Sequence, residues 1–328
     1  MLQERGVCIG DRLYKPMTNR RKHAVLVTGG CGFIGSHLVD KLIENGYRVV
    51  VLDDLSTGSI KNLNPGAVLY QGDVSDRFFV NKIFEQYKFG HVIHEATTIN
   101  TNALHEIPLH DLKSSANSTI ILAENCIKHN VNNLIFGSSV AVYGRPKFLP
   151  AAEDSLIDPI YSYGIAKYTA ESYLKYFYTY HNLNYQILRY TNVFGPRQPI
   201  YGEVGVIAIY TDRLIKGENL IIFGDGEHQR DYIHVNDAVE FTLKSMQFNT
   251  SSTYNVGRGV PVTVNEVFAE FQTNDPQHKQ AVHKPERYGE IGNFYSNIDC
   301  ALSTGWRPKV TLKEGIKDTI DSFKQSLL

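Results

Sequence analysis

The sequence predicts an α/β fold, in which a doubly wound parallel sheet is combined with a smaller mixed α/β lobe. Three observations lead to this prediction. A short apolar strand passes through a glycine turn directly into a helix at residues 24–38, and strands then alternate with helices as far as Tyr190. Beyond Tyr190 the alternation stops, and turns separate shorter elements. Since parallel strands need crossover connections, usually helices, the first half predicts a parallel sheet covered on both faces.

Length and composition are those of a large globular chain. The 328 residues are 42% apolar, which allows two domains or one domain with a lobe. Lys and Arg number 33 against 34 for Asp and Glu, giving a formal net charge of -1. No global field therefore attracts nucleic acid or an anionic membrane, and we expect a small-molecule partner, with no nucleic acid and no membrane.

The cysteines are Cys8, Cys31, Cys126 and Cys300, which lie far apart and form no CxxC pair. Neither a disulfide framework nor a metal site is indicated, and a cytoplasmic location fits. Charged residues interrupt residues 1–22, so we expect an N-terminal extension outside the fold rather than a signal peptide. No apolar run approaches the length of a membrane span.

The first strand, Ala24 to Val27, leads into a turn in which Gly29, Gly32 and Gly35 are spaced three apart. This is a variant of the dinucleotide fingerprint, whose glycines allow a tight turn, close approach to a pyrophosphate and close helix packing. The free N–H groups of the following helix, apolar on one face over residues 33–42, would face the phosphates. Spacing alone leaves open a glycine-rich turn without a ligand.

The second strand, Tyr47 to Leu52, ends in Asp53 and Asp54. Their distance from Gly29 is about that at which a dinucleotide site places a carboxylate on the adenosine ribose. A carboxylate there repels a 2′-phosphate, so the pair favours NAD over NADP. The alternative is a pair of solvated acids in a turn.

Further strands and helices continue the alternation. Ser138 and Ser139 follow the strand that ends at Phe136, where polar side chains of a parallel sheet face the ligand crevice. We expect strands over residues 68–71, 91–94, 133–136 and 186–190, and helices over residues 77–87, 109–129 and 161–181.

Tyr163 and Lys167 lie four residues apart in the last of these helices and so share one face. Lowering a tyrosine pKa from about 10 to neutrality needs about 4 kcal/mol. One positive charge about 6 Å away supplies roughly 3 kcal/mol at an effective dielectric of about 20. Lys167 and an oxidised nicotinamide together would suffice, which makes Tyr163 a candidate general base. On spacing alone, Tyr163 could equally be a packing residue of a tyrosine-rich helix.

Beyond Tyr190 we expect a helix over residues 206–216, a hairpin over residues 221–232, a helix over residues 237–246 and a strand over residues 253–256. The last strand would return to the sheet, so the two units are interleaved. The predicted division is an N-terminal extension (1–22), a Rossmann-type NAD-binding domain (23–190 with 230–257) and a substrate lobe (191–229 with 258–328).

From Ala24 to Ser326 the chain resembles the extended short-chain dehydrogenase/reductases, specifically the NAD-dependent nucleotide-sugar epimerases and dehydratases. The matching stretches occur in order: TGGCGFIGSHL, DDLSTG, GDVSD, SSVAVYG, YSYGIAK, RYTNVFGPRQ, GDGEHQRDYIHVNDA, PERYGEIGNFYSNID and GWRPKVTLKEGI. The resemblance implies NAD as cofactor, Tyr163 as base, Lys167 on the nicotinamide ribose, and Ser139 bridging the sugar hydroxyl to Tyr163. It assigns to the cofactor Gly29, Gly32, Phe33, Ile34, Gly35, Asp53, Asp54, Ser56, Thr57, Gly58, Asp73, Val74, Ala96, Thr97, Thr98, Ser115, Tyr163, Lys167 and Tyr190.

The resemblance also implies a nucleotide-sugar site. Arg230 and Arg287 correspond to arginines on the diphosphate, for which a planar guanidinium is well suited, and Glu290 to an acid on the nucleotide ribose. The residues it assigns to the substrate are Ser139, Tyr163, Asn192, Val206, Phe223, Arg230, Arg287, Glu290 and Phe294.

The reaction is suggested by the residues after Ser139. Dehydratases of the family carry an acid pair there, whereas this chain has Val140 and Ala141. The resemblance therefore favours 4-epimerisation of a UDP-hexose of the glucose and galactose type through a 4-keto sugar. A 4,6-dehydratase, a decarboxylase, and a 4-epimerase of a UDP-N-acetylhexosamine or UDP-uronic acid remain alternatives, as does a catalytically silent NAD-binding module. By the same resemblance, Phe294 corresponds to a position whose bulk influences whether an N-acetyl group fits, and its size favours a plain hexose.

Three positions depart from the family pattern. Glu95 stands where an apolar residue is usual, Ser115 where an asparagine often contacts the cofactor, and Tyr161-Ser162 where serine-proline precedes the catalytic tyrosine. The departures leave the substrate less defined than the fold. The resemblance further implies a homodimer through the helix that holds Tyr163 and the helix over residues 109–129.

Overall fold

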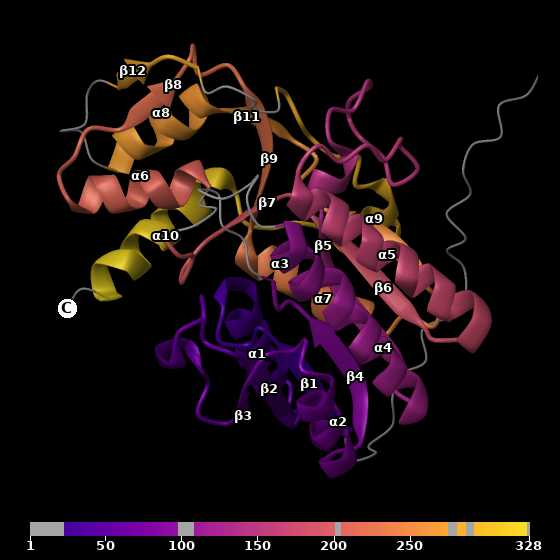
Figure 1. Ribbon diagram of the computed structural model, residues 1–328. Coiled ribbons are helices and arrows are strands. Elements are labelled where there is room, and N and C mark those ends of the chain that lie inside the picture. The colour runs from indigo at the N-terminus through magenta and orange to yellow at the C-terminus, as the bar shows by residue number, and fades with distance from the viewer. Residues whose placement is uncertain (1–22, 98–107, 201–204, 275–280, 287–291, 327–328) are drawn as a thin grey trace, which may run out of the picture.

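The computed structural model describes residues 23–97, 108–200, 205–274, 281–286 and 292–326. Its central sheet has seven strands, all parallel, in the order β10-β6-β5-β4-β1-β2-β3 (Figure 1). The order reverses between β1 and β4, which is the switch point where ligands bind in such sheets. The strands are β1 (Ala24–Thr28), β2 (Val49–Asp53), β3 (Val68–Gln71), β4 (Phe89–His94), β5 (Asn133–Ser139), β6 (Tyr185–Tyr190) and β10 (Ser252–Val256).

Helices cover both faces of this sheet, and each face has its own apolar core. Strands such as β2, with the sequence VVVLD, are buried along their whole length, as a sheet covered on both sides requires. One core joins the sheet to α2 (Arg77–Gln86), α4 (Ser118–Lys128) and α5 (Ser162–His181). The other joins it to α1 (Phe33–Glu44), α7 (Val235–Ser245) and α9 (Asp299–Ser303).

The smaller lobe lies beyond the carboxyl ends of the strands, at the upper left of Figure 1. Its core includes Tyr210, Tyr232 and Phe271. Its helices are α6 (Val206–Ile215), α8 (Val264–Asn274) and α10 (Leu312–Ser326), and its strands are β7 (Asn192–Phe194), β8 (Ile221–Phe223), β9 (Gln229–His234), β11 (Pro261–Thr263) and β12 (Val282–Lys284).

The fold class and the strand alternation are confirmed. The hairpin predicted over residues 221–232 is wrong, because β8 pairs with β12 while β9 pairs with β7 and β11. The helix expected over residues 109–129 is three segments: α3 (Pro108–Leu112), a π-helical turn (Lys113–Asn117) and α4.

The boundaries of the two units and the N-terminal extension stay predictions, and residues 1–22 lie outside the described residues. No described helix meets the length and apolarity needed to cross a membrane.

Candidate functional site

The glycine turn brings β1, β4 and α1 together at the switch point. Gly29 has φ +70°, a conformation that favours glycine, and a Cβ on it would lie 2.7 Å from the backbone nitrogen of Ala96 after β4. A Cβ on Gly35 would collide with the carbonyl group of Gly29. Gly32 stands before α1 without a side-chain cap, so the first N–H groups of this helix remain available to a ligand.

Asp53, the last residue of β2, faces the same turn. Its carboxylate accepts hydrogen bonds from the backbone nitrogens of Cys31 and Leu55, both at 2.8 Å. These bonds fix the carboxylate beside the glycine turn, although burial raises its pKa. Asp54 instead accepts from the nitrogen and hydroxyl of Ser56 and stabilises the turn that follows.

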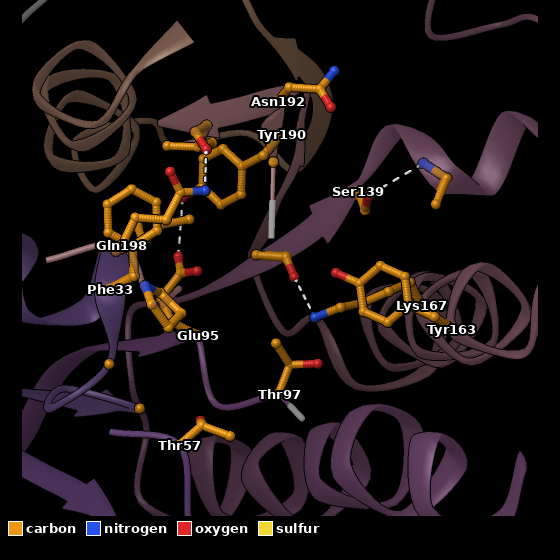
Figure 2. A pocket seen from close by; sticks show the side chains of 18 of the residues that line it. Phe33, Thr57, Glu95, Thr97, Ser139, Tyr163, Lys167, Tyr190, Asn192 and Gln198 are labelled. Carbon is orange, nitrogen blue, oxygen red and sulfur yellow. Dashed lines mark hydrogen bonds between the residues drawn. The ribbon is translucent and has the colours of Figure 1, made fainter. Parts of the chain in front are cut away.

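A cavity of about 860 Å³ extends from this turn past the ends of the strands and into the smaller lobe (Figure 2). It brings together most of the residues predicted from the sequence. Those lining it are Gly29, Gly32, Phe33, Ile34, Gly35, Asp53, Asp54, Ser56, Thr57, Asp73, Val74, Ala96, Thr97, Ser139, Tyr163, Lys167, Tyr190, Asn192, Val206, Phe223, Arg230 and Phe294.

Five predicted residues are not part of this lining as described. Gly58 lies behind it, where a Cβ would touch the carboxylate of Asp53 at 3.0 Å. Ser115 is fully buried, while its neighbour Ser114 lines the cavity. Thr98, Arg287 and Glu290 lie outside the described residues.

Ser139, Tyr163 and Lys167 border one part of the cavity. Ser139 ends β5, and its hydroxyl accepts a hydrogen bond from the nitrogen of Ala141 at 3.1 Å. Tyr163 stands in the first turn of α5 with its hydroxyl directed into the cavity in Figure 2. Lys167, only 1% exposed, places its ammonium 5.6 Å from the centre of the Tyr163 ring. The three residues can therefore act on one hydroxyl of a ligand.

Lys167 is held by the backbone rather than by a carboxylate. Its Nζ donates a hydrogen bond to the carbonyl oxygen of Gly137 in β5 at 2.7 Å. Burial lowers the pKa of Lys167, and the charges of Glu95 and Glu171 oppose that effect. The charge of Lys167 thus depends on its acidic neighbours.

Glu95 follows β4 and also lines the cavity, a role that the sequence marked only as a departure from the family pattern. Its Oε1 accepts a hydrogen bond from the hydroxyl of Tyr190 at 3.0 Å. A Cβ on Gly137 would lie within 2.9 Å of its carboxyl carbon, so the carboxylate packs directly on that glycine. Burial raises its pKa.

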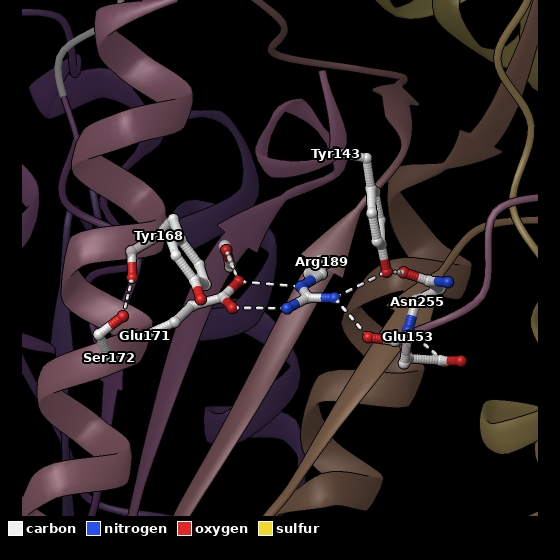
Figure 3. Close-up of polar contacts among 8 residues, drawn as sticks. Tyr143, Glu153, Tyr168, Glu171, Ser172, Arg189 and Asn255 are labelled. Atoms are coloured by element: carbon white, nitrogen blue, oxygen red, sulfur yellow. Dashed lines mark hydrogen bonds and ion pairs between the residues drawn. The ribbon is translucent and has the colours of Figure 1, made fainter. Parts of the chain in front are cut away.

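Behind these residues lies a buried ion pair (Figure 3). Glu171 of α5 accepts from Nε and Nη2 of Arg189 in β6 at 3.0 and 2.7 Å, and also from the hydroxyl of Ser138 at 2.6 Å. Arg189 donates in addition to the hydroxyl of Tyr143 at 2.8 Å. The pair fixes α5 against β5 and β6, and so fixes the place of Tyr163.

The far end of the cavity is bordered by the smaller lobe. Asn192 donates to the carbonyl oxygen of Asp231 at 3.2 Å, and Arg230 donates to the carbonyl oxygens of Gln229 and Gly292. Phe294 stacks on Tyr143 with the ring centres 6.0 Å apart. Phe294 lines the cavity, whereas the buried Tyr143 ring is not part of the lining and packs against Phe294.

Two contacts that the sequence did not predict hold the segment after β7 against α1. Arg197 pairs with Asp40 at 2.7 Å, and His37 bonds the carbonyl oxygen of Pro196 at 2.9 Å. Gln198, beside them, lines the cavity together with Arg197. The motif RYTNVFGPRQ contains no pattern that predicts these contacts.

The polar groups of the cavity fit a dinucleotide. Among the described residues, the buried oxygen Oγ1 of Thr97 has no hydrogen-bond partner and stands in the lining. The α1 N-terminus and the glycine turn leave space and N–H groups for a pyrophosphate, and Asp53 offers a carboxylate to a ribose.

Comparison with known proteins gives consistent results. Residues 25–257 match the NAD dependent epimerase/dehydratase family. The chain is 41% identical to the UDP-glucose 4-epimerase of Thermotoga maritima, solved with UDP-glucose, with a TM-score of 0.90 and coverage of 93% of this chain and 100% of that one. It is 34% identical to the UDP-glucose 4-epimerase of Thermus thermophilus, solved with NAD (TM-score 0.85; 92% and 99%). A UDP-glucose 4-epimerase of Mycolicibacterium smegmatis is 33% identical (91% and 98%).

Proposed function

This chain belongs to the NAD dependent epimerase/dehydratase family, and from that premise we propose that it interconverts UDP-glucose and UDP-galactose by inversion at C4, with NAD as its cofactor. The observation that carries the proposal is the convergence of Ser139, Tyr163 and Lys167 on one cavity that begins at the glycine turn. Relatives that are 41% and 33% identical to this chain over nearly its whole length are named UDP-glucose 4-epimerases.

NAD would be held by the turn between β1 and α1, by β2 and by α5. The glycine turn and the N-terminus of α1 would receive the pyrophosphate, Asp53 the adenosine ribose, and Lys167 the nicotinamide ribose. When bound there, NAD would supply the acceptor and donor for hydride transfer at C4. Because the reaction leaves no net oxidation, the enzyme needs no added oxidant.

The protein's own residues handle the proton. We assign Tyr163 as the base that removes the proton of the 4-hydroxyl and later restores it, and Ser139 as the residue that orients this hydroxyl. Lys167, with its ammonium 5.6 Å from the Tyr163 ring centre, would stabilise the phenolate. The 4-keto sugar must turn between the two transfers, for which the cavity of about 860 Å³ offers room.

The walls beside Ser139 favour epimerisation over elimination. Val140 and Ala141 line the cavity there and carry no acid that could protonate a leaving hydroxyl. Phe294, which lines the cavity and stacks on the buried Tyr143, supports a plain hexose rather than an N-acetylated one. Asn192 and Arg230, with Arg287 and Glu290 outside the described residues, are proposed to hold the UDP portion.

The test is incubation of the purified enzyme, without added NAD, with UDP-glucose, UDP-galactose and their N-acetyl forms, followed by NMR. We expect C4 inversion of the plain hexoses, with the N-acetyl forms turned over much more slowly. Tyr163→Phe should lower kcat about 10²- to 10⁴-fold while leaving KM and the content of bound NAD within a few-fold. Absence of C4 inversion, or mass-spectrometric loss of water or carbon dioxide, would reject the proposal.

We also propose a homodimer and a cytoplasmic location. Ile165, Tyr173, Tyr176 and Tyr180 of α5 recur at helical spacing and are all exposed. Ile120 and Ile127 of α4 border a shallow hollow together with two of them. An apolar aromatic stripe over two neighbouring helices suits a second copy of this chain. Cys31 and Cys126, buried and unpaired, support a reducing compartment.

A further inference from the structure

Lys167 is a buried cation whose charge needs a counter-charge. Its Nζ is bonded to a neutral carbonyl oxygen and lies against the rings of Phe136 and Tyr163, with the ring centres 4.8 and 5.6 Å away. Neither a carbonyl group nor an aromatic face neutralises an ammonium. Within the described residues, the carboxylates whose charges act on Lys167 are Glu95 and Glu171.

Glu171 is already committed to another cation. Both of its oxygens accept from Arg189, at 3.0 and 2.7 Å, in a pair with side-chain exposures of 0% and 2%. The opposite charge of Arg189 weakens the action of Glu171 on Lys167, which is smaller than that of Glu95. Among the described residues, Glu95 is therefore the main counter-charge of Lys167.

Glu95 and Lys167 lie on two sides of the same residue. Lys167 bonds the carbonyl oxygen of Gly137, while the carboxylate of Glu95 packs against the α-carbon of Gly137, where glycine alone leaves space for it. Figure 2 shows both side chains entering the cavity from β4 and α5. Among the described residues, the other charged or titratable groups facing this place are His94, whose pKa is lowered by burial, Tyr163, Tyr190 and the Glu171–Arg189 pair.

Tyr190 makes the position suitable for a carboxylate. Its hydroxyl donates to Glu95 Oε1 at 3.0 Å and shares a second hydrogen bond of 2.8 Å with Oγ1 of Thr242. A glutamine at position 95 could accept the same bond through its own Oε1. A glutamine therefore changes the charge and leaves the shape and the hydrogen bond in place.

We infer that Glu95 is a positioning residue that supplies the counter-charge of Lys167 across Gly137 and so keeps this lysine protonated in the buried site. Its action on the reaction passes through Lys167 and Tyr163, and in that respect the inference rests on the function proposed above. An apolar residue at this position would leave Lys167 with Glu171, already paired with Arg189, as its remaining counter-charge among the described residues.

The direct test is titration of Lys167 in the purified holoenzyme labelled with [6-¹³C]lysine, following the ¹³Cε shift by NMR. The Lys167 signal is assigned by its absence in Lys167→Met. In Glu95→Gln we expect the pKa of Lys167 to fall by about one unit or more, because an opposite charge has been removed. Glu95→Leu should lower it as well, and thermal unfolding of each variant verifies the fold.

Thr242→Val is the matched control. It removes the other hydroxyl partner of Tyr190 without changing any charge. The pKa of Lys167 should therefore stay within about 0.3 units of its wild-type value. If Glu95→Gln and Glu95→Leu also stay within that margin, the inference is wrong. This readout requires no turnover, so it stands apart from success or failure of the epimerase assay.

The pH profile of kcat/KM supplies the second readout. An amine with a lowered pKa loses its charge at a lower pH, so the alkaline limb of Glu95→Gln should move down by the same one unit or so. At pH values above the alkaline limbs of both proteins, kcat/KM of Glu95→Gln should be about tenfold lower than that of the wild type. Near pH 6, the two values of kcat/KM should agree within a few-fold. A profile that falls equally at all pH values would instead indicate a merely structural role.

Discussion

At Gly35 the molecule has no room for a side chain. A Cβ there would meet the backbone of Gly29 and Gly30, with the carbonyl carbon of Gly29 at 2.8 Å, and backbone atoms cannot move aside as a side chain can. The residue stands in the first turn of α1 and sets how closely this helix approaches β1. The same closeness shapes the place proposed for the pyrophosphate.

Gly35→Ala should therefore both destabilise the protein and weaken NAD binding. We expect a loss of about 1–3 kcal/mol in the free energy of unfolding, as for other overpacked positions, and a lower content of NAD in the purified protein. Gly66→Ala is the control, because its Cβ would meet only side-chain atoms at 3.3 and 3.4 Å. Its stability should stay within about 0.5 kcal/mol. Thermal unfolding and the absorbance of released nucleotide measure both effects, and a wild-type result for Gly35→Ala would contradict the steric account.

Individual residues were predictable where the chemistry is local. The glycines, Asp53 and the Tyr163–Lys167 pair follow from spacing within one strand, turn or helix, and the cavity includes them. Glu95 is different, since its environment is built by Gly137 from β5, Tyr190 from β6 and Lys167 from α5. No spacing in the sequence relates these residues. The same holds for the contact between Arg197 and Asp40.

At the scale of elements, α5 links the chemistry to the sheet. Tyr163, Lys167 and Glu171 follow one another at intervals of four and so share one face of the helix. The first two face the cavity, and the third is bound to Arg189 and Ser138 in the strands beneath. The helix therefore cannot turn or slide without breaking a buried ion pair.

Glu171→Gln should destabilise the protein strongly. Removing one partner of a buried pair leaves the other charge uncompensated, and we expect a loss of about 3–5 kcal/mol in the free energy of unfolding. Glu44→Gln is the matched control, because Glu44 pairs with Lys41 at 2.7 Å on the exposed surface of α1. That change should cost less than about 1 kcal/mol. Denaturant unfolding compares the two, and equal losses would contradict the role given to the buried pair.

Elements were predicted well where their partners are neighbours in the alternation. All seven strands of the central sheet were expected from apolar runs between helices. The predicted hairpin over residues 221–232 was wrong. Turn residues between two short strands do not determine whether these strands pair with each other or with strands that are distant in the sequence. β8 pairs instead with β12, about sixty residues later, and such nonlocal pairing leaves no local pattern. The π-helical turn before α4 was missed for a similar reason, since its sequence continues the helical periodicity.

At the scale of the whole molecule, the outer face of α4 and α5 is an exposed apolar surface of the described residues. Tyr176 is 46% exposed and Tyr180 71% exposed, although both belong to the helix that carries the proposed base. A partner on this face would stiffen the catalytic helix from outside, as the Glu171–Arg189 pair does from inside.

Tyr173→Glu with Tyr176→Glu should separate the proposed homodimer into monomers. Two carboxylates placed in an apolar contact repel their symmetry mates and resist desolvation. Light scattering should then give a mass near the 37.0 kDa of one chain, against about twice that value for the wild type. Phe148→Glu is the control, since this side chain is 84% exposed elsewhere on the surface, and it should leave the mass unchanged. A monomeric wild type would rule out the dimer.

The order of the strands also has a consequence for how the chain is made. Ser139, Tyr163 and Lys167, the proposed proton-transfer group, all lie before Tyr190. The strand β10 that pairs with β6 is made only when residues 252–256 are added, and the helix α7 that packs on α1 only at residues 235–245. A nascent chain that ends near residue 190 would expose an open strand edge and an uncovered apolar helix face, which are sites of aggregation. Synthesis must therefore run well past the catalytic residues before all seven strands of the sheet that carries them can pair.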